Sequence, residues 1–257
     1  MSIKFTILGC GSSVGVPRAD GFFGKCDPKE KKNYRTRCSS LISTNNKNIL
    51  IDTSPDLRNQ LLSNKITNVD AVLYTHMHAD QTHGINELRL FYLKYKKKIP
   101  VYANNLTRKY LKKSFSFCFR KTLGYPPILS LKKLKENHKF KDHKNCISIK
   151  SIPVEHGHIK CMSFIINKKC AYASDVSLIP KKNLKYFKNL NYLIIDCLRF
   201  KKHPSHYNLD EVLDLIKEIK PKKTILTNLN NEMDYKSLIK ILPRNVTPAF
   251  DGMSFLI

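Results

Sequence analysis

A short apolar run that ends in a cluster of histidines most limits what this chain can fold into. Residues 70–74 read as a buried strand, and they lead directly into T-H-M-H-A-D at residues 75–80. Because His76 and His78 are two residues apart at the end of a strand, their imidazoles can turn toward one point. Asp80, at the start of the next helix, can join them. Imidazole and carboxylate groups together suit zinc or a similar divalent cation. Alone, the motif also fits ordinary polar residues at a turn.

Two later strands also end in residues that can bind a metal. Residues 147–153 run into His156, and residues 170–173 run into Asp175. Each residue singly is more typical of a helix cap or a solvated side chain. Together they add a third imidazole and a second carboxylate, and a carboxylate can bridge two metal ions.

The order of the expected elements predicts an α/β fold. Expected strands lie at 3–8, 39–43, 47–52, 100–103, 163–166, 192–196 and 224–226, and expected helices at 56–62, 84–93, 209–219 and 235–242. The lysine-rich residues 94–145 are expected to hold one or two helices over the site. Because no low-complexity linker divides the chain, we expect residues 1–257 to form a single domain of two sheets flanked by helices.

Several further stretches, in order along nearly the whole chain, carry a family resemblance. They are L-G-C-G at 8–11, G-V-P at 15–17, R-C-S at 37–39, L-I-D at 50–52, H-G-I-N-E-L-R at 83–89, S-D-V-S at 174–177, I-D-C at 195–197, H-Y-N-L-D at 206–210 and F-D-G-M at 250–253. With the histidine motif, they resemble the metallo-β-lactamase superfamily, and in finer detail its PhnP-like branch of cyclic-phosphate phosphodiesterases. The resemblance implies the metallo-β-lactamase fold, a four-layer αββα sandwich.

Carried over position by position, the resemblance implies a set of metal ligands. These would be His76, His78, His156, Asp80 and Asp175. The three histidines would hold the first metal, Asp175 would bridge, and Asp80 would ligate the second metal and so serve catalysis. His206 lies where the branch places a histidine near the scissile phosphate, which implies a general acid. A surface histidine at a helix N-terminus is the alternative for His206.

Two positions depart from the family pattern. The usual H-x-H-x-D-H ends here in Gln81, and the late histidine that follows a Leu-Thr strand is Asn228. Both positions belong to the second metal, and amide oxygens are weak ligands for zinc. Three outcomes stay open: one metal, with both amides bonded to water or substrate; a second site for Mn²⁺ or Mg²⁺ held by amide carbonyls; or an impaired protein with another role. We expect one or two Zn²⁺ ions per chain, with Mn²⁺ as the alternative.

The cysteines predict neither disulfides nor a structural metal. All eight are scattered without a C-x-x-C pair, which is typical of a reducing compartment. The branch carries a structural zinc on cysteines of its early loop, but here that loop keeps only Cys26 before Cys38, and the late partner position is Asn231. We expect no structural zinc. With no signal peptide and no apolar span, we expect a cytoplasmic protein without a membrane partner, for which a homodimer is compatible.

The net charge of +26, from 46 basic and 20 acidic residues, attracts anions. The basic residues are mostly lysines in scattered runs, as in AT-rich genomes, so we assign the charge to composition and solvated surface ahead of a nucleic-acid face. The expected function is metal-dependent hydrolysis of a small cyclic or nucleotide-like phosphate ester. Arg89 is expected either to contact phosphate or to form a buried ion pair. The alternatives are an RNA-processing nuclease, and a catalytically impaired member that binds phosphate or a partner.

Overall fold

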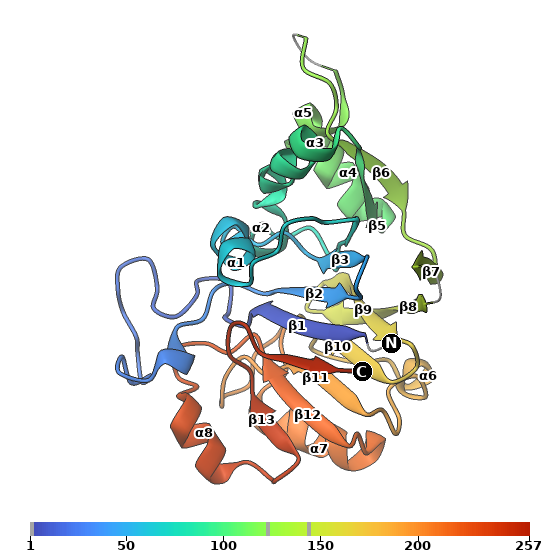
Figure 1. The fold of residues 1–257 in the computed structure, drawn as a ribbon. Coiled ribbons are helices and arrows are strands. Elements are labelled where there is room, and N and C mark those ends of the chain that lie inside the picture. Colours follow the sequence, from blue (N-terminus) through green and yellow to red (C-terminus); the bar gives the residue numbers. More distant parts are fainter. Residues whose placement is uncertain (1–2, 122–123, 143–144) are drawn as a thin grey trace.

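Two mixed β-sheets face each other in the computed structural model, which describes residues 3–121, 124–142 and 145–257 (Figure 1). The first sheet consists of β1 Lys4–Gly9, β2 Ser39–Ser43, β3 Asn48–Ile51, β4 Ala71–Leu73, β5 Ile99–Ala103, β6 Leu129–Lys133 and β14 Ser254–Leu256. The second consists of β7 Asn137–Asp142, β8 Asn145–His156, β9 Ile159–Ile166, β10 Cys170–Ala173, β11 Tyr192–Asp196, β12 Lys223–Thr227 and β13 Val246–Pro248. Their strand orders are β14-β1-β2-β3-β4-β5-β6 and β13-β12-β11-β10-β9-β8-β7.

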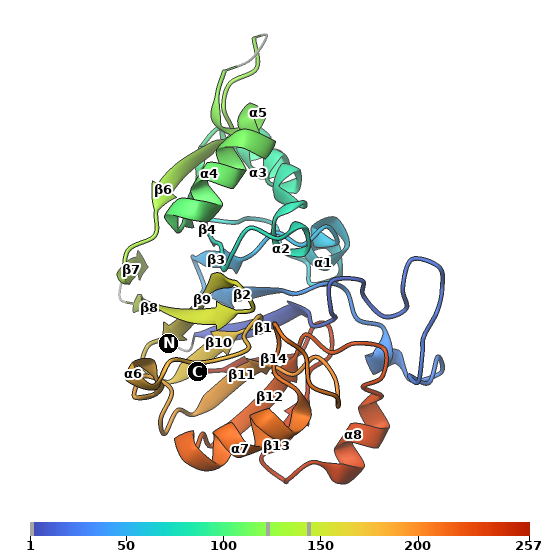
Figure 2. The same ribbon diagram turned by 180° about the vertical axis from the view of Figure 1, so that it is seen from behind.

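Helices cover the outer face of each sheet, as the view from behind also shows (Figure 2). Those on the first sheet are α1 Leu57–Ser63, α2 Ala79–Thr82, α3 Arg89–Tyr95, α4 Asn105–Ser114 and α5 Ser116–Phe119, with the 3-10 turn η2 Ile85–Leu88. Those on the second are α6 Lys181–Leu184, α7 Leu209–Ile219 and α8 Tyr235–Ile241. A second 3-10 turn, η1 Lys31–Asn33, lies in the early loop.

Three apolar clusters separate the four layers. Ile49 on β3 lies in the cluster between the sheets, whereas its neighbour Leu50 lies in the cluster between the first sheet and its helices. On β11, Ile194 faces the other sheet, and Leu193 faces the helices of its own side. This alternation follows from the period of two along a strand. The predicted α/β fold, the αββα sandwich, is confirmed.

Parallel pairing brings the candidate residues to one edge. Strands β3, β4, β5 and β6 pair in parallel, and so do β10, β11, β12 and β13. Neighbouring parallel strands end on the same side of a sheet, which is where open α/β sheets bind ligands. Within each sheet, the residues that follow these strands are therefore gathered at one edge: those after β4 in the first sheet, and those after β10 and β12 in the second.

The lysine-rich segment differs most from its prediction. It holds two helices, α4 and α5, as expected, but also the strands β6 and β7, which the sequence pattern did not predict. In addition, the helix expected over 84–93 is divided into η2 and α3. We call residues 89–141 the basic lobe; its helices α3, α4 and α5 lie in the upper part of Figure 1. No helix among the described residues is long and apolar enough to cross a membrane.

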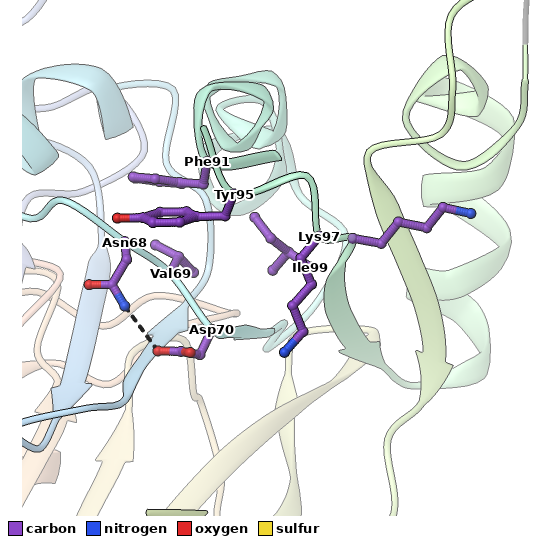
Figure 3. A pocket seen from close by; sticks show the side chains of 8 residues that line it. Asn68, Val69, Asp70, Phe91, Tyr95, Lys97 and Ile99 are labelled. Carbon is purple, nitrogen blue, oxygen red and sulfur yellow. Dashed lines mark hydrogen bonds between the residues drawn. The ribbon is translucent and has the colours of Figure 1, made fainter. Parts of the chain in front are cut away.

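A hollow of about 280 Å³ lies where the basic lobe meets the loop before β4 (Figure 3). Its lining includes Asp70, whose carboxylate accepts hydrogen bonds from Asn48 N at 2.8 Å and Asn68 Nδ2 at 3.2 Å, and pairs with Lys47 at 3.5 Å. The Asp70 carboxylate in this hollow is thus already satisfied, and none of the candidate metal ligands lines the hollow.

Candidate metal centre

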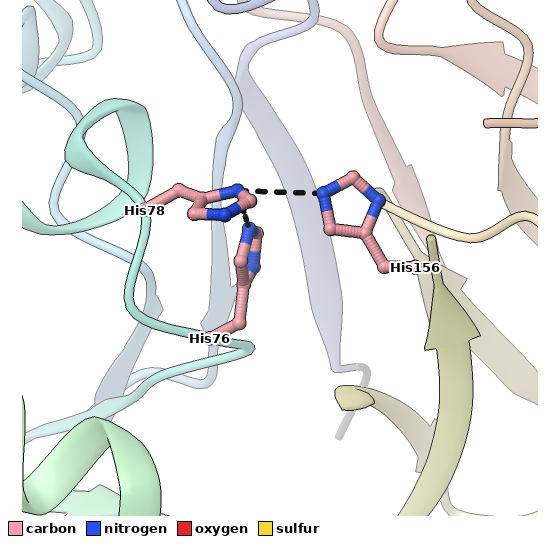
Figure 4. Close-up of side chains that lie close together, drawn as sticks. All are labelled: His76, His78 and His156. Carbon is pink, nitrogen blue, oxygen red and sulfur yellow. Dashed lines mark hydrogen bonds between the residues drawn. The ribbon is translucent and has the colours of Figure 1, made fainter. Parts of the chain in front are cut away.

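Three imidazoles from two parts of the chain meet at one point (Figure 4). His76 and His78 follow β4, and His156 ends β8. His78 Nδ1 lies 2.9 Å from His76 Nε2 and 3.4 Å from His156 Nε2. Tetrahedral ligation of zinc, with Zn–N distances of about 2 Å, places neighbouring nitrogens about 3.3 Å apart. The three nitrogens therefore have nearly the spacing of a zinc site.

Hydrogen bonds behind the imidazoles determine which nitrogens face this point. His156 Nδ1 donates to the carbonyl of Ser205 at 2.7 Å, which leaves the lone pair on Nε2. His76 Nδ1 lies 3.0 Å from Thr75 Oγ1, and that hydroxyl donates to Asp52 Oδ2 at 2.7 Å. Carbonyl and carboxylate groups in these positions orient metal-binding histidines and raise their basicity.

The imidazoles are held in the neutral form. Burial lowers the pKa of His76 to about 3, and it also lowers the pKa values of His78 and His156. The imidazoles further lower one another's pKa values, because two neighbouring positive charges repel. Neutral imidazoles can offer the lone pairs of these three closely spaced nitrogens to a divalent cation, so this donor set fits a metal ion.

Asp175 supplies a carboxylate beside the imidazoles. Ligand atoms of His156, Asp175 and His206 lie within 4.8 Å of one another. Burial opposes ionisation of Asp175, but the charge of neighbouring histidines, among them the protonated His206, outweighs it and lowers the pKa of Asp175. The carboxylate is therefore ionised and can act as an oxygen ligand.

The amides of Gln81 and Asn228 lie between the carboxylates. Gln81 Nε2 donates to Asp80 Oδ2 at 3.0 Å and to Asp175 Oδ2 at 3.3 Å. Asn228 Nδ2 donates to Asp175 Oδ1 at 3.2 Å and to the carbonyl of Ser174 at 3.0 Å. Burial and the charge of Asp175 raise the pKa of Asp80. The amide nitrogens, rather than the amide oxygens, thus face the carboxylates.

His206 lies next to this centre with a carboxylate partner of its own. Its side chain is only 15 % exposed, and its Nδ1 lies 2.6 Å from Oδ2 of the fully buried Asp196. Burial alone would lower the pKa of His206, but Asp196 outweighs it and raises this pKa to about 9. His206 is therefore protonated at neutral pH. It lies beside Asp175 and is not a solvated surface histidine.

The sequence analysis gave no role in the centre to four residues that support it, namely Asp52, Thr75, Asp196 and Ser205. The sequence did offer a signal for Asp196 as a site residue, because it is a carboxylate at the end of an apolar strand. Arg89 does not form the buried ion pair that was one of its two expected roles: it is exposed, and its guanidinium lies 5.4 Å from the centre of the Tyr125 ring.

A buried arginine joins the early loop, residues 16–37, to the segment after β12. Arg35 is 2 % exposed, and it donates to Asn33 Oδ1 at 3.1 Å and to the carbonyls of Asn230 at 3.3 Å and Met233 at 2.7 Å. Cys26, the remaining cysteine of this loop, lies against the same guanidinium, 3.9 Å from Nη1. We refer to these contacts as the Arg35 clamp.

Comparisons with known structures agree with this fold. The structure is similar to that of a diphosphatase from the PhnP family, with 28% sequence identity, a TM-score of 0.89, and coverage of 100% of this chain and 98% of that chain. At the level of the fold it is also similar to Zn²⁺-bound PqqB from Methylobacterium extorquens (17% identity, TM-score 0.78, 98% and 99% covered) and to the short form of human tRNase Z (16% identity, TM-score 0.70, 98% of each chain covered).

Sequence comparisons give a family. A curated relative is an octanoyltransferase from Porphyromonas gingivalis (strain ATCC BAA-308 / W83), 30% identical over 260 residues. The match covers 99% of this chain and 52% of the relative, so the chain spans about half the relative's length. Residues 47–227 match the family described as "Beta-lactamase superfamily domain". The chain therefore belongs to the beta-lactamase superfamily, the family of hydrolases with the metallo-β-lactamase fold.

Proposed function

We propose that this chain hydrolyses a small cyclic or nucleotide-like phosphate ester, using one divalent metal ion held by His76, His78 and His156 with Asp175. One observation carries the proposal: three neutral imidazole nitrogens converge beside an ionised carboxylate and a protonated histidine. The likeness to a diphosphatase along the whole chain supports a phosphate substrate. The nitrogen-rich donor set favours Zn²⁺, with Mn²⁺ as the alternative.

The metal would supply Lewis acidity, which lowers the pKa of water toward about 7 and polarises the phosphate. The protein residues orient and transfer protons around it. Asp175 is ionised, so it can orient the attacking water. His206 holds a proton at neutral pH, and it can donate this proton to the leaving oxygen as the bond from phosphorus to that oxygen breaks. The buried Asp196 stabilises the protonated form of His206 and fixes the orientation of its ring.

We propose that the second metal subsite holds no ion. A second cation would have to displace the hydrogen bonds that Gln81 and Asn228 make to the carboxylates. In their present orientation these amides fix Asp80 and Asp175 in place without a charge of their own. Asp80 then has a positioning role, because it anchors the Gln81 amide that bonds to Asp175.

The experiment measures metal content and hydrolysis together. The metal content of protein purified without added metal is measured by inductively coupled plasma mass spectrometry. The same protein is assayed for hydrolysis of bis(p-nitrophenyl) phosphate and of a 2′,3′-cyclic nucleotide. The His78→Ala variant should lose both metal and hydrolysis, whereas the matched His158→Ala variant, which alters an exposed histidine outside the centre, should keep both. Hydrolysis that persists in His78→Ala would contradict the proposal. A parent protein with neither metal nor hydrolysis, even with zinc or manganese added, would favour a binding role.

A further inference from the structure

The positive charge of this chain is concentrated in the basic lobe. Residues 89–141 include 16 lysines and arginines but a single acidic residue, Glu136, whereas the other 204 residues include 30 basic and 19 acidic residues. A composition bias that raises lysine throughout the chain does not explain why acidic residues are almost absent from one lobe. The asymmetry therefore needs an explanation specific to this surface.

The cations of the lobe have no internal counter-charge. Fifteen of the sixteen are exposed, and Arg108 is half-buried. No ion pair between described residues includes any of them, and Glu136 pairs instead with Lys150 of β8. Such a cluster repels itself and attracts a partner with many negative charges, such as a nucleic acid.

One hollow in the lobe has the chemistry of a phosphate site. It measures about 390 Å³, and its lining includes Lys98, Lys112 and Arg120 together with Ser116 and Ser130. Three cations and two hydroxyl groups can hold phosphate oxygens by charge-assisted hydrogen bonds. Its lining residues include no carboxylate, unlike the hollow in Figure 3, which contains Asp70.

A second hollow, which shares helix α5 with the first, presents aromatic rings. It measures about 230 Å³ and is lined by Arg89, Tyr92, Phe117 and Tyr125, among others. Phe117 and Tyr125 are 50% and 64% exposed, and Arg89 lies over the Tyr125 ring. Exposed aromatic faces beside cations stack on unpaired bases. An acidic protein or an anionic membrane would use the cations without needing these rings.

We propose that the basic lobe binds single-stranded nucleic acid, with phosphates in the basic hollow and bases against Phe117 and Tyr125. The lobe is attached next to the metal centre: His83, just after α2, lies 3.0 Å from the Tyr110 hydroxyl and packs edge-on against the Phe115 ring at 5.5 Å. This binding requires neither metal nor hydrolysis. Its failure can therefore be distinguished from failure of the proposed function.

The first test separates local charge from net charge. Binding of a fluorescently labelled 20-nucleotide single-stranded RNA is followed by anisotropy from 50 to 300 mM salt. The lobe variant Lys98→Glu/Lys112→Glu/Arg120→Glu should bind at least about tenfold more weakly, with a salt slope lower by about 2, since three phosphate contacts are lost. The control Lys181→Glu/Lys182→Glu/Lys188→Glu makes the same change in charge at exposed positions in and after α6, and it should lose less than about threefold. Equal losses in both variants, or no binding by the parent at 100 mM salt, would overturn the proposal.

The second test identifies the class of partner. Phe117→Ser/Tyr125→Ser keeps every cation and should weaken RNA binding about fivefold or more, because stacking on each base is lost. The same variant should bind polyglutamate as the parent does. An unchanged RNA affinity in this variant would overturn the assignment. So would parent affinity for polyglutamate, or for vesicles of 70% phosphatidylcholine and 30% phosphatidylserine, that matches its affinity for RNA.

Discussion

The altered metal subsite can be tested by restoring the two histidines of the family pattern. In Gln81→His/Asn228→His, both amides that now bond to the carboxylates are replaced by imidazoles. The backbone allows the change at Asn228, whose φ of 61° lies in the left-handed region, because histidine is among the residues that adopt it most readily. Gln81 lies within the helix α2, where histidine is tolerated.

The expected magnitude follows from the hydrogen bonds that are lost. Three of the amide hydrogen bonds end on carboxylates: two on Asp175 and one on Asp80. Hydrogen bonds to charged groups contribute about 1.5–3 kcal/mol each, and the new imidazoles can replace some of them. We therefore expect the chelated double variant to lose about 3 kcal/mol in free energy of unfolding. Zinc should restore the lost free energy of unfolding, as the metal content rises from about one ion per chain to about two.

Two measurements check this prediction: elemental analysis of the purified protein, and urea unfolding in the presence of either a chelator or zinc. As a matched control, Asn105→His/Asn137→His adds two imidazoles at exposed positions, and it should change neither quantity. If the double variant still binds a single ion, or if it is as stable as the parent in chelator, the assignment of the amides to the second metal subsite is wrong.

Three further predictions follow from the buried charged groups. His206→Gln should slow turnover without loss of metal. Because the pKa of His206 is about 9, the activity of the parent should fall as the pH rises through 9, and the pH–rate profile of the variant should lack this decline. Arg35→Met should lower the free energy of unfolding in urea by about 3 kcal/mol, because it leaves buried acceptors without donors; the exposed control Arg58→Met should stay within about 0.5 kcal/mol of the parent. The pKa of Asp234 is lowered to about 2, because its hydrogen bonds outweigh the effect of burial. Its contribution to stability should therefore be present above about pH 4 and be lost as the pH falls toward 2. The urea unfolding curves of Asp234→Asn and the parent should differ at pH 6 and converge at pH 2.

The sequence could predict the parts of the fold and centre that leave a local signal. Polar residues directly after apolar runs placed His76, His156 and Asp175 at strand ends, and parallel pairing brings such ends together. Strand β7, Asn137–Asp142, left no such signal, because its residues are nearly all polar and its pairing with β8 determines its conformation. Strand β6 was also missed, because its short L-S-L alternation lies in a lysine-rich stretch and its parallel pairing with β5 determines its conformation.

The hydrogen-bond partners of the histidines could not be predicted from the sequence, because tertiary contacts determine them. Nothing in the sequence pattern connects Asp52 with Thr75, and this pair forms only when the neighbouring parallel strands β3 and β4 end together. Asp196 meets His206 only because the loop between β11 and α7 folds back over the end of β11. The state of Gln81 was left open for a related reason: which end of an amide faces a carboxylate depends on every group around it.

The Arg35 clamp makes the shape of the early loop independent of metal supply. A guanidinium is part of the chain, so chelators cannot extract it and oxidants that attack thiolate clusters do not release it. Treatment with EDTA should therefore remove the metal ion from the proposed centre, while residues 16–37 keep their conformation. Adding metal back should then restore turnover within the time of mixing, without a refolding step.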